Sequence, residues 1–192
     1  MDRMKIVIYC LLGLSIGSAV RGQSVKNFNL IDVATKNEVS LTDFSDKKGV
    51  VVIFTSNVCP YSVYYEGRIT QLVADYRDKG IQFLLVNSHT ESKESISEMA
   101  NKIATWGLNV PYLADKNQQL LSQFGARKSP EAFILKKGGN GFTIFYKGAI
   151  DNNPQVATDV KESYLKMNLD TLLKGGSSNS GARPIGCTIR KG

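Results

Sequence analysis

The chain has 192 residues, of which 42% are hydrophobic and 21% are charged, and its formal net charge is +7 at pH 7. This composition is typical of a globular protein and excludes a disordered or fibrous chain. A chain of this length can bury a core that folds without disulfide bonds, so any disulfide needs a functional argument. The basic residues are scattered, which favours a solvated surface over a nucleic-acid-binding face, and we predict no nucleic-acid partner.

The first 22 residues have the layout of a secretory signal peptide. Arg3 and Lys5 precede an uncharged stretch at residues 6–20, and small residues stand near its end. The stretch is shorter than the about 20 apolar residues that a transmembrane helix needs. We therefore predict export, to the periplasm or out of the cell, with no stable membrane insertion after cleavage. An uncleaved membrane anchor is the alternative.

Removal of this segment would leave two cysteines. Cys10 lies within the segment, and its bulky neighbours argue against a lipid-modified cysteine, so we expect it to leave with the signal. The mature chain then carries Cys59 and Cys187 in a compartment where disulfides can persist. Its net charge falls to +5, because the segment holds three basic residues and one acidic residue.

Beyond residue 23 the predicted elements alternate between strands and helices, as a βαβ fold requires. We predict a short strand at 28–32, which polar turns follow, and then an apolar strand at 50–55. A helix at 62–78 and a second buried strand at 81–87 come next. The helix ends before Gly80, because glycine suits a left-handed cap beyond the last turn. This strand–helix–strand unit predicts an α/β domain.

Signals in the second half of the chain are weaker. We predict helices at 92–105, 118–124 and 156–174, an extended piece at 109–113, and strands at 131–136 and 142–147. The two strands flank "KGGNG", a turn that predicts an antiparallel hairpin. The stretch "GGSSNSG" has the composition of a flexible linker. The expected organisation is a signal peptide at 1–22, a domain at 23–174, and a cysteine-containing tail at 175–192.

The stretch "SNVCPYS" lies where the first buried strand meets the helix. Cys59 therefore stands at a helix N-terminus, where unpaired backbone N–H groups and the helix dipole favour the thiolate, the nucleophilic form. Pro60 suits the first turn because its missing N–H would have no partner there. We predict a reactive Cys59; a small buried hydrophobic residue is the alternative.

Four segments carry a family resemblance: "VVVIFTSNVCPY", "GIQFLLVNS", "LLSQFGARKSPEAFIL" and "GCTIRKG". The chain resembles the thioredoxin-fold superfamily, specifically its peroxiredoxin-like redoxin branch labelled AhpC/TSA, over about residues 24–192. The resemblance implies a thioredoxin-like fold with a central mixed β-sheet flanked by helices. It implies that Cys59 is the redox-active cysteine, that Pro130 is cis and lies against it, and that Ser129 offers backbone groups to a thiol or peptide. A Gly-Cys pair near the C-terminus makes Cys187 a candidate partner.

The sequence departs from the two better-defined subfamilies. Thioredoxins and glutaredoxins carry a second cysteine where this chain has Ser62, and a hydroxyl cannot attack a mixed disulfide, so Cys59 alone would stall after its first step. In the peroxiredoxin pattern Pro-x-x-x-Thr-x-x-Cys, Ser56 can stand for the threonine, but Val52 replaces the proline. Arg127 is the candidate for a peroxide-orienting arginine.

Cys187 is the candidate for the missing second thiol. It follows the flexible linker, and a tethered thiol has a high local concentration near the domain. It could attack a mixed disulfide or a sulfenic acid on Cys59. Two alternatives remain open: a permanent disulfide that clasps the tail, and an exposed thiol without a role.

Lesser candidates complete the predicted site. Pro60, Tyr61, Ser62, Ser129 and Pro130 would contact the substrate. The only histidine, in "VNSHTES", is a candidate base or a plain loop residue. One histidine and two mature cysteines do not make a metal site, and we predict neither a metal nor a cofactor.

Three functions follow. The first is an exported oxidoreductase that exchanges disulfides through Cys59 with Cys187 resolving, acting on thiol- or disulfide-containing proteins and recycled by an external thiol reductant. The second is reduction of peroxide through a sulfenic acid on Cys59. The third is a non-enzymatic binding module that captures thiol-bearing partners.

Overall fold

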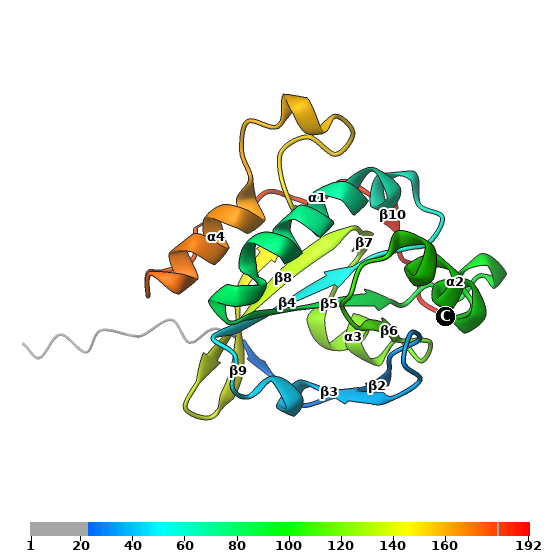
Figure 1. The fold of residues 1–192 in the computed structure, drawn as a ribbon, viewed down its shortest axis with the longest axis horizontal. Helices are drawn as coiled ribbons and strands as arrows, with labels where there is room; N and C mark the ends of the chain where they lie inside the picture. Colours follow the sequence, from blue (N-terminus) through cyan, green and yellow to red (C-terminus); the bar gives the residue numbers. More distant parts are fainter. Residues whose placement is uncertain (1–22, 180) are drawn as a thin grey trace, which may run out of the picture.

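A six-stranded sheet forms the centre of the molecule, in the strand order β1-β9-β8-β4-β5-β6 (Figure 1). The computed structural model describes residues 23–179 and 181–192, so the predicted signal peptide lies outside the described residues. The strands are β1 (Ser24–Val25), β4 (Gly49–Phe54), β5 (Ile81–Asn87), β6 (Tyr112–Ala114), β8 (Glu131–Gly138) and β9 (Gly141–Gly148). β4, β5 and β6 run parallel, whereas β8, β9 and β1 continue the sheet antiparallel. The sheet is therefore mixed, as predicted.

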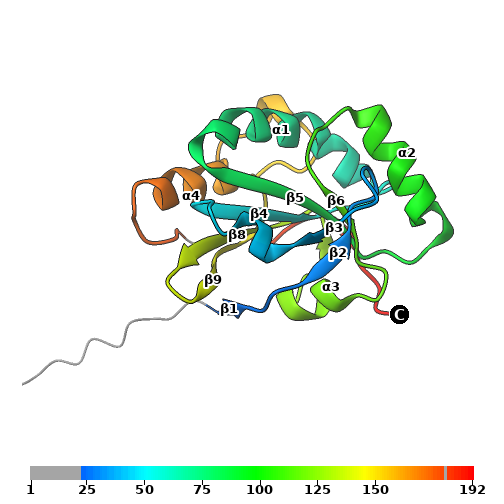
Figure 2. The ribbon, with the colours of Figure 1, turned by 60° about the horizontal axis from the view of Figure 1, so that its bottom comes forward.

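The central sheet separates two hydrophobic clusters. Val51 and Ile53 of β4 belong to one cluster, and Val50 and Val52 of the same strand belong to the other. Because successive side chains point to opposite faces of a sheet, one apolar run fills both cores. The helices are α1 (Pro60–Tyr76), α2 (Ile96–Trp106), α3 (Gln119–Phe124) and α4 (Tyr164–Leu173). Figure 2 shows α1, α2 and α4 on one side of the sheet and α3 on the other.

The strand–helix–strand unit predicted from the sequence is present as β4, α1 and β5. The helix starts two residues earlier than predicted, at Pro60, and ends in a short 3₁₀ turn, Arg77–Lys79. Gly80 follows with a φ of 81°, which is the left-handed cap expected of it. β8 and β9 form the predicted antiparallel hairpin.

The N-terminal part of the domain holds more strand than predicted. β2 (Asn29–Ile31) matches the short strand expected there, and it pairs antiparallel with β3 (Glu38–Ser40). We predicted polar turns over the β3 segment, because the flanking residues are polar and no apolar run marks the strand. The small sheet lies on the α3 side of the molecule, as Figure 2 shows.

The prediction of a long helix at 156–174 is wrong in its first half. Only α4 is α-helical there, and a loop with one 3₁₀ turn, Ala157–Asp159, precedes it. Asn152 Oδ1 accepts hydrogen bonds from the backbone N–H groups of Lys161 and Glu162, at 2.9 and 3.1 Å. Asparagine side chains that bond nearby backbone groups compete with helix formation. These bonds hold the segment in a closed loop.

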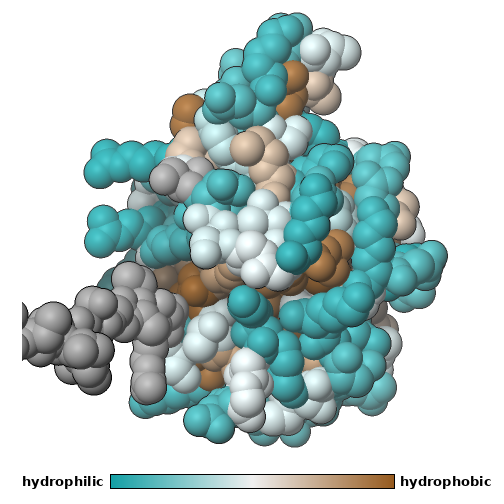
Figure 3. Space-filling model, turned by 90° about the vertical axis from the view of Figure 1, so that its left-hand side faces the viewer, coloured by the Kyte–Doolittle hydropathy of each residue, from teal (hydrophilic) through white to brown (hydrophobic). Residues whose placement is uncertain are grey.

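The face on the side of α4 and the β8–β9 turn is mostly hydrophilic, and hydrophobic residues show only in small areas between the polar ones (Figure 3). Single exposed hydrophobic residues of this kind are normal on a folded domain. Across the part of the chain that the structure describes, no helix is long and apolar enough to cross a membrane.

Candidate active site at the Cys59–Cys187 pair

Cys59 and Cys187 form a disulfide, with their Cα atoms 6.0 Å apart. Cys59 is the residue directly before α1 and is buried, with 3% of its surface exposed. Cys187 begins β10 (Cys187–Thr188) and is half-buried. Figure 1 places β10, in red, beside the N-terminal end of α1. The bond argues against the idle-thiol alternative for Cys187.

The topology of the sheet explains why Pro130 lies at this site. β8 runs antiparallel to β4, with Glu131 opposite Phe54. The residues before β8 therefore lie beside the residues after β4. The Ser129–Pro130 bond is cis, as the resemblance implied, and the carbonyl oxygen of Ser129 lies 3.3 Å from Cys59 Sγ. In the disulfide this is a close contact, because the sulfur has no proton; a Cys59 thiol could donate a hydrogen bond there.

The tail adds a strand at the same place. β10 pairs antiparallel with β7 (Lys128–Ser129), with Cys187 opposite Ser129 and Thr188 opposite Lys128. We expected the backbone of Ser129 to be open to a bound peptide, and the chain's own C-terminal segment lies along it. Although the linker composition predicted a flexible tail, its end packs on the domain.

A buried carboxylate supports the loop before α1. The backbone N–H of Cys59 donates to Ser56 Oγ at 2.9 Å, and the Ser56 hydroxyl donates to Glu94 Oε1. The other oxygen of Glu94 accepts from the Asn57 backbone N–H at 2.8 Å and from Asn87 Nδ2 at 2.6 Å. Glu94 is only 1% exposed. Sequence reasoning missed this residue, because it lies in a polar run that reads as helix caps.

Ser62 lies one helical turn after Cys59, at the fourth position of the Cys-x-x-Cys pattern. Its side chain is 1% exposed, and its Oγ has no hydrogen-bond partner among the described residues. Pro60 is exposed in the first turn, and the half-buried Tyr61 packs edge-on against Tyr64 with ring centroids 6.5 Å apart. Of the predicted substrate-contacting residues, Pro60 and Tyr61 therefore lie at the rim of the site, whereas Ser62, Ser129 and Pro130 are buried.

His89 lies at the same site, because it follows β5, the strand next to β4. Its Nε2 is 2.8 Å from Ser129 Oγ, and its Nδ1 is 3.6 Å from a carboxylate oxygen of Glu91. Burial lowers the pKa of His89 below its usual 6.5, although the carboxylates of Glu94 and Glu91 act in the opposite direction. A neutral imidazole at pH 7 can accept a proton from a neighbouring group.

A surface pocket of about 630 Å³ lies beside the disulfide, and both cysteines line it together with Pro60 and His89. Arg127 is exposed and lines a different pocket with Lys128 and Glu131. The candidate peroxide-orienting arginine therefore does not line the pocket of the cysteines.

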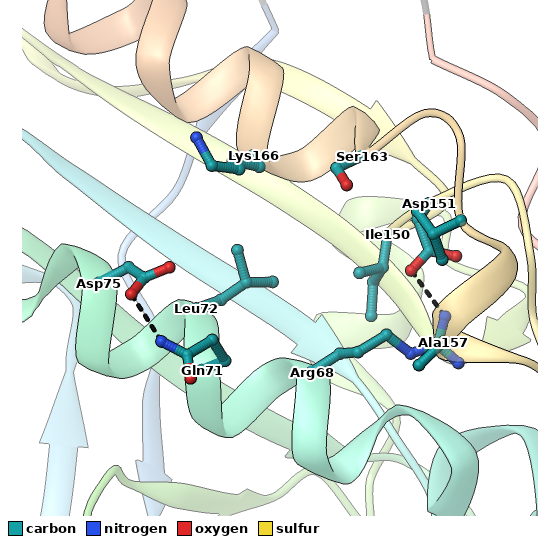
Figure 4. Close-up of a pocket in the computed structure, with 10 residues that line it drawn as sticks. Arg68, Gln71, Leu72, Asp75, Ile150, Asp151, Ala157, Ser163 and Lys166 are labelled. Atoms are coloured by element: carbon teal, nitrogen blue, oxygen red, sulfur yellow. Dashed lines mark hydrogen bonds and ion pairs between the residues drawn. The ribbon is translucent and has the colours of Figure 1, made fainter.

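Another pocket lies between α1, α4 and the loop that joins β9 to α4 (Figure 4). Its most buried ion pair joins Arg68 Nη1 to Asp151 Oδ2 at 2.6 Å. Asp151 also accepts a hydrogen bond from the Tyr65 hydroxyl at 2.8 Å. The ion pair and this hydrogen bond together hold the loop against α1. Neither cysteine lines this pocket, and we assign it a structural role.

The chain is similar in sequence and in structure to known proteins. A thiol-disulfide oxidoreductase of Geobacillus thermodenitrificans, ResA, is 28% identical over 118 residues, which span 62% of this chain and 64% of that protein. The crystal structure of an uncharacterized conserved protein from Geobacillus kaustophilus has 26% identity and a TM-score of 0.81, covering 90% of this chain and 92% of that one. A putative thioredoxin from Neisseria meningitidis shares the fold, with 21% identity and a TM-score of 0.60 over 80% of this chain and 91% of its own.

The fold is therefore thioredoxin-like, as the sequence predicted. Residues 21–141 match the family model described as AhpC/TSA family, a span that includes Cys59 and Pro130 but ends before Cys187. Because this match extends over more than half of the chain, the protein belongs to the AhpC/TSA family.

Proposed function

We propose that the protein is an exported thiol-disulfide oxidoreductase in which Cys59 is the nucleophile and Cys187 is the resolving cysteine. The observation that carries the proposal is the disulfide between these residues, located where a strand ends, a helix begins and the Ser129–Pro130 bond lies alongside. The similarity to a relative named as a thiol-disulfide oxidoreductase supports the same reaction class.

The reaction proceeds by two exchanges. The thiolate of reduced Cys59 attacks a substrate disulfide, which forms a mixed disulfide and releases one substrate sulfur as a thiolate that takes up a proton. Cys187, as a thiolate, then attacks the sulfur of Cys59, which forms the internal disulfide and releases the second substrate thiol. One substrate disulfide is reduced to two thiols, and two enzyme thiols are oxidised to one disulfide. An external thiol reductant returns the enzyme to its dithiol form.

Two features of the site favour disulfide exchange over peroxide reduction. The Ser56 hydroxyl, which would stand for the peroxiredoxin threonine, already donates to the buried Glu94 and accepts from the Cys59 N–H. Arg127 is exposed and lines another pocket. A hydroxyl that is already engaged and an arginine outside the pocket do not form a site for a peroxide.

Export is part of the proposal. The arrangement of charged, apolar and small residues over 1–22 is typical of a signal peptide. A disulfide between the two remaining cysteines fits an oxidising compartment, because cytosolic thiols are kept reduced. Detection of the mature N-terminus by mass spectrometry after expression in a bacterium tests this part directly.

The test of the reaction compares the protein lacking residues 1–22 with its single-cysteine variants. We expect the wild-type protein to reduce insulin in the presence of a small thiol, Cys59→Ser to be inactive, and Cys187→Ser to accumulate a mixed disulfide on Cys59. Peroxide consumption by the wild-type protein in place of insulin reduction would favour the second function. Inactivity in both assays, with mixed disulfides still formed on Cys59, would favour the binding module.

A further inference from the structure

The tail is held on both sides of Cys187 by contacts that do not involve its sulfur. On the N-terminal side, the Ala149 N–H donates to the carbonyl oxygen of Ala182 at 3.0 Å. On the C-terminal side, the Ile189 N–H donates to the carbonyl oxygen of Arg127 at 3.0 Å. Residues 183–188 are therefore a short segment between two attachment points, which is far more restricted than a tail tethered at α4 alone.

Ile189 is the apolar anchor of this arrangement. Its side chain is 5% exposed and belongs to the hydrophobic cluster that contains Val50, Val52 and residues of α3. Ile185, at the same distance on the other side of Cys187, is 55% exposed. The burial of Ile189 removes apolar surface from water whether or not the disulfide exists.

Gln118 receives the last residues of the chain. Its Nε2 donates to the carbonyl oxygen of Arg190 at 2.7 Å, and its Oε1 accepts from the Gly192 N–H at 2.9 Å. The same amide nitrogen lies 3.0 Å from the carbonyl oxygen of Ser88, beside His89. Gln118 is 9% exposed, so both ends of its amide are used within the protein.

Gly186 allows the tail to approach Ser129. A Cβ atom at this position would overlap the Ser129 carbonyl oxygen and come within 2.6 Å of the carbonyl carbon. The backbone of the tail is therefore in direct contact with the loop before Pro130, next to Cys187. The fit depends on backbone atoms and on the absence of a side chain from glycine, and it does not depend on the S–S bond.

We propose that Ile189 and Gln118 are positioning residues that keep Cys187 next to Cys59 in the dithiol form of the protein. This inference rests on the proposed function, because it describes how the resolving step of that reaction is made fast. A flexible tether gives a second thiol an effective concentration of about the millimolar range. A tail that stays attached at Ile189 after reduction gives a higher value, because Cys187 does not have to be brought back to the site.

The equilibrium with glutathione measures this effective concentration without any substrate protein. One glutathione disulfide oxidises the two enzyme thiols to the Cys59–Cys187 disulfide and is itself reduced to two glutathione molecules. The equilibrium constant of this reaction has units of concentration, and it is obtained by acid quenching, alkylation and intact-mass analysis. We expect the wild-type value to exceed that of a flexible tether of about the millimolar range by at least about 10-fold.

The variants form a graded and matched series. Ile189→Ala should lower the effective concentration by about 10-fold or more, and Ile189→Val by about 3-fold, since the loss follows the buried volume removed. Asparagine tolerates the left-handed backbone conformation of position 118, but its side chain is too short to form the two hydrogen bonds to the tail. Gln118→Asn should therefore lower the effective concentration by about 5-fold. Ile185→Ala, in the same tail but exposed, should leave it within about 2-fold.

Thermal unfolding of each variant in a Cys59→Ser, Cys187→Ser background checks that the domain is folded. If Ile189→Ala does not fold, the effective concentration is compared for Gln118→Asn and for a chain truncated after Ile189 in its place. A wild-type value in the range of a flexible tether, or equal values for Ile189→Ala and Ile185→Ala, would overturn the inference. If Ile189→Ala lowers the effective concentration and insulin is still not reduced by the wild-type protein, the positioning stands and the proposed function fails. If the wild-type protein reduces insulin and all variants have the same effective concentration, the proposed function stands and the positioning role fails.

Discussion

At the scale of single residues, the chemistry of the site is set by what surrounds Cys59. The N–H of Cys59 is already bonded to Ser56, so the donors that remain next to a Cys59 thiolate on its own helix are those of the first turn of α1. Ser62 lies in that turn with a buried hydroxyl that lacks a partner among the described residues. Reduction of the disulfide creates an acceptor one turn away. We infer that Ser62 then donates to the thiolate.

Ser62→Ala should therefore raise the pKa of reduced Cys59. The loss of one hydrogen bond to a charged group corresponds to about one pKa unit or slightly more. The measurement is the pH dependence of alkylation of Cys59 in a Cys187→Ala variant of the protein lacking residues 1–22, where Cys59 is the only cysteine. Ser97→Ala, on the exposed face of α2, is the control. An unchanged profile in Ser62→Ala would show that the hydroxyl has no part in thiolate stabilisation.

Sequence reasoning identified the residues that depend on local position and missed those that depend on tertiary contact. Cys59 and Pro60 were found because a strand–helix junction is visible in the sequence. Glu94 and Ile189 were not found, since a glutamate in a polar run and an isoleucine near a chain end look like surface residues until the fold is known. The pairing of Cys187 was left among three alternatives for the same reason.

At the scale of elements, the ends of β5 and β6 hold a second set of buried polar groups beside the site. Lys116 Nζ donates to the His89 carbonyl oxygen at 2.8 Å and to Asn87 Oδ1 at 3.2 Å. Burial lowers the pKa of Lys116 from 10.5 to about 8, although the carboxylates of Glu94 and Asp115 act in the opposite direction. This amine fixes the loop that carries His89.

The lowered pKa of Lys116 predicts a pH dependence of stability. Between pH 8 and 10.5, Lys116 is charged in the unfolded chain and increasingly neutral in the folded one, so the unfolded state binds more protons. The contribution of Lys116 to the free energy of unfolding therefore rises with pH across this window. Chemical denaturation from pH 7.5 to 9.5 should show that Lys116→Met loses this rise relative to wild type.

Lys161→Met, at an exposed position, is the matched control and should follow the wild-type pH dependence. If the wild-type protein and Lys116→Met have parallel stability curves over the whole range, Lys116 is not neutralised by folding. The comparison of variants is necessary because the buried tyrosines, whose pKa values are raised, act in the opposite direction at the upper end of the range.

Two elements show where sequence patterns did not determine structure. The apolar spacing over 156–174 fits a helix, yet Asn153 and Asn152 accept hydrogen bonds from backbone N–H groups of its first half, those of Val156 and Lys161, and hold it as a loop. β10 has two residues and could not be recognised from a pattern, because it exists only through its pairing with β7. Both outcomes depend on groups outside the segment itself.

At the scale of the whole molecule, the thioredoxin-like arrangement follows from the buried strands. β4 and β5 are apolar on both faces, so each must be covered by helices, and the crossover through α1 makes them parallel. That much could be predicted from the sequence. The position of the tail could not be predicted, because its linker composition indicates a flexible segment. Gly186 and Ile189 instead fit surfaces that are formed by distant segments of the chain.

The proposed reaction depends on one redox pair in which the two cysteines have different roles. The direct measurement is intact-mass analysis of the fully reduced protein lacking residues 1–22, sampled over time after one equivalent of glutathione disulfide is added. We predict that the wild-type protein loses two thiols to an internal disulfide, and that Cys187→Ser retains one glutathione on Cys59. Cys59→Ser should react much more slowly at Cys187. Equal rates of glutathione addition to Cys59 and Cys187 in the two single variants, or a wild-type protein that retains glutathione without closing the disulfide, would contradict the account.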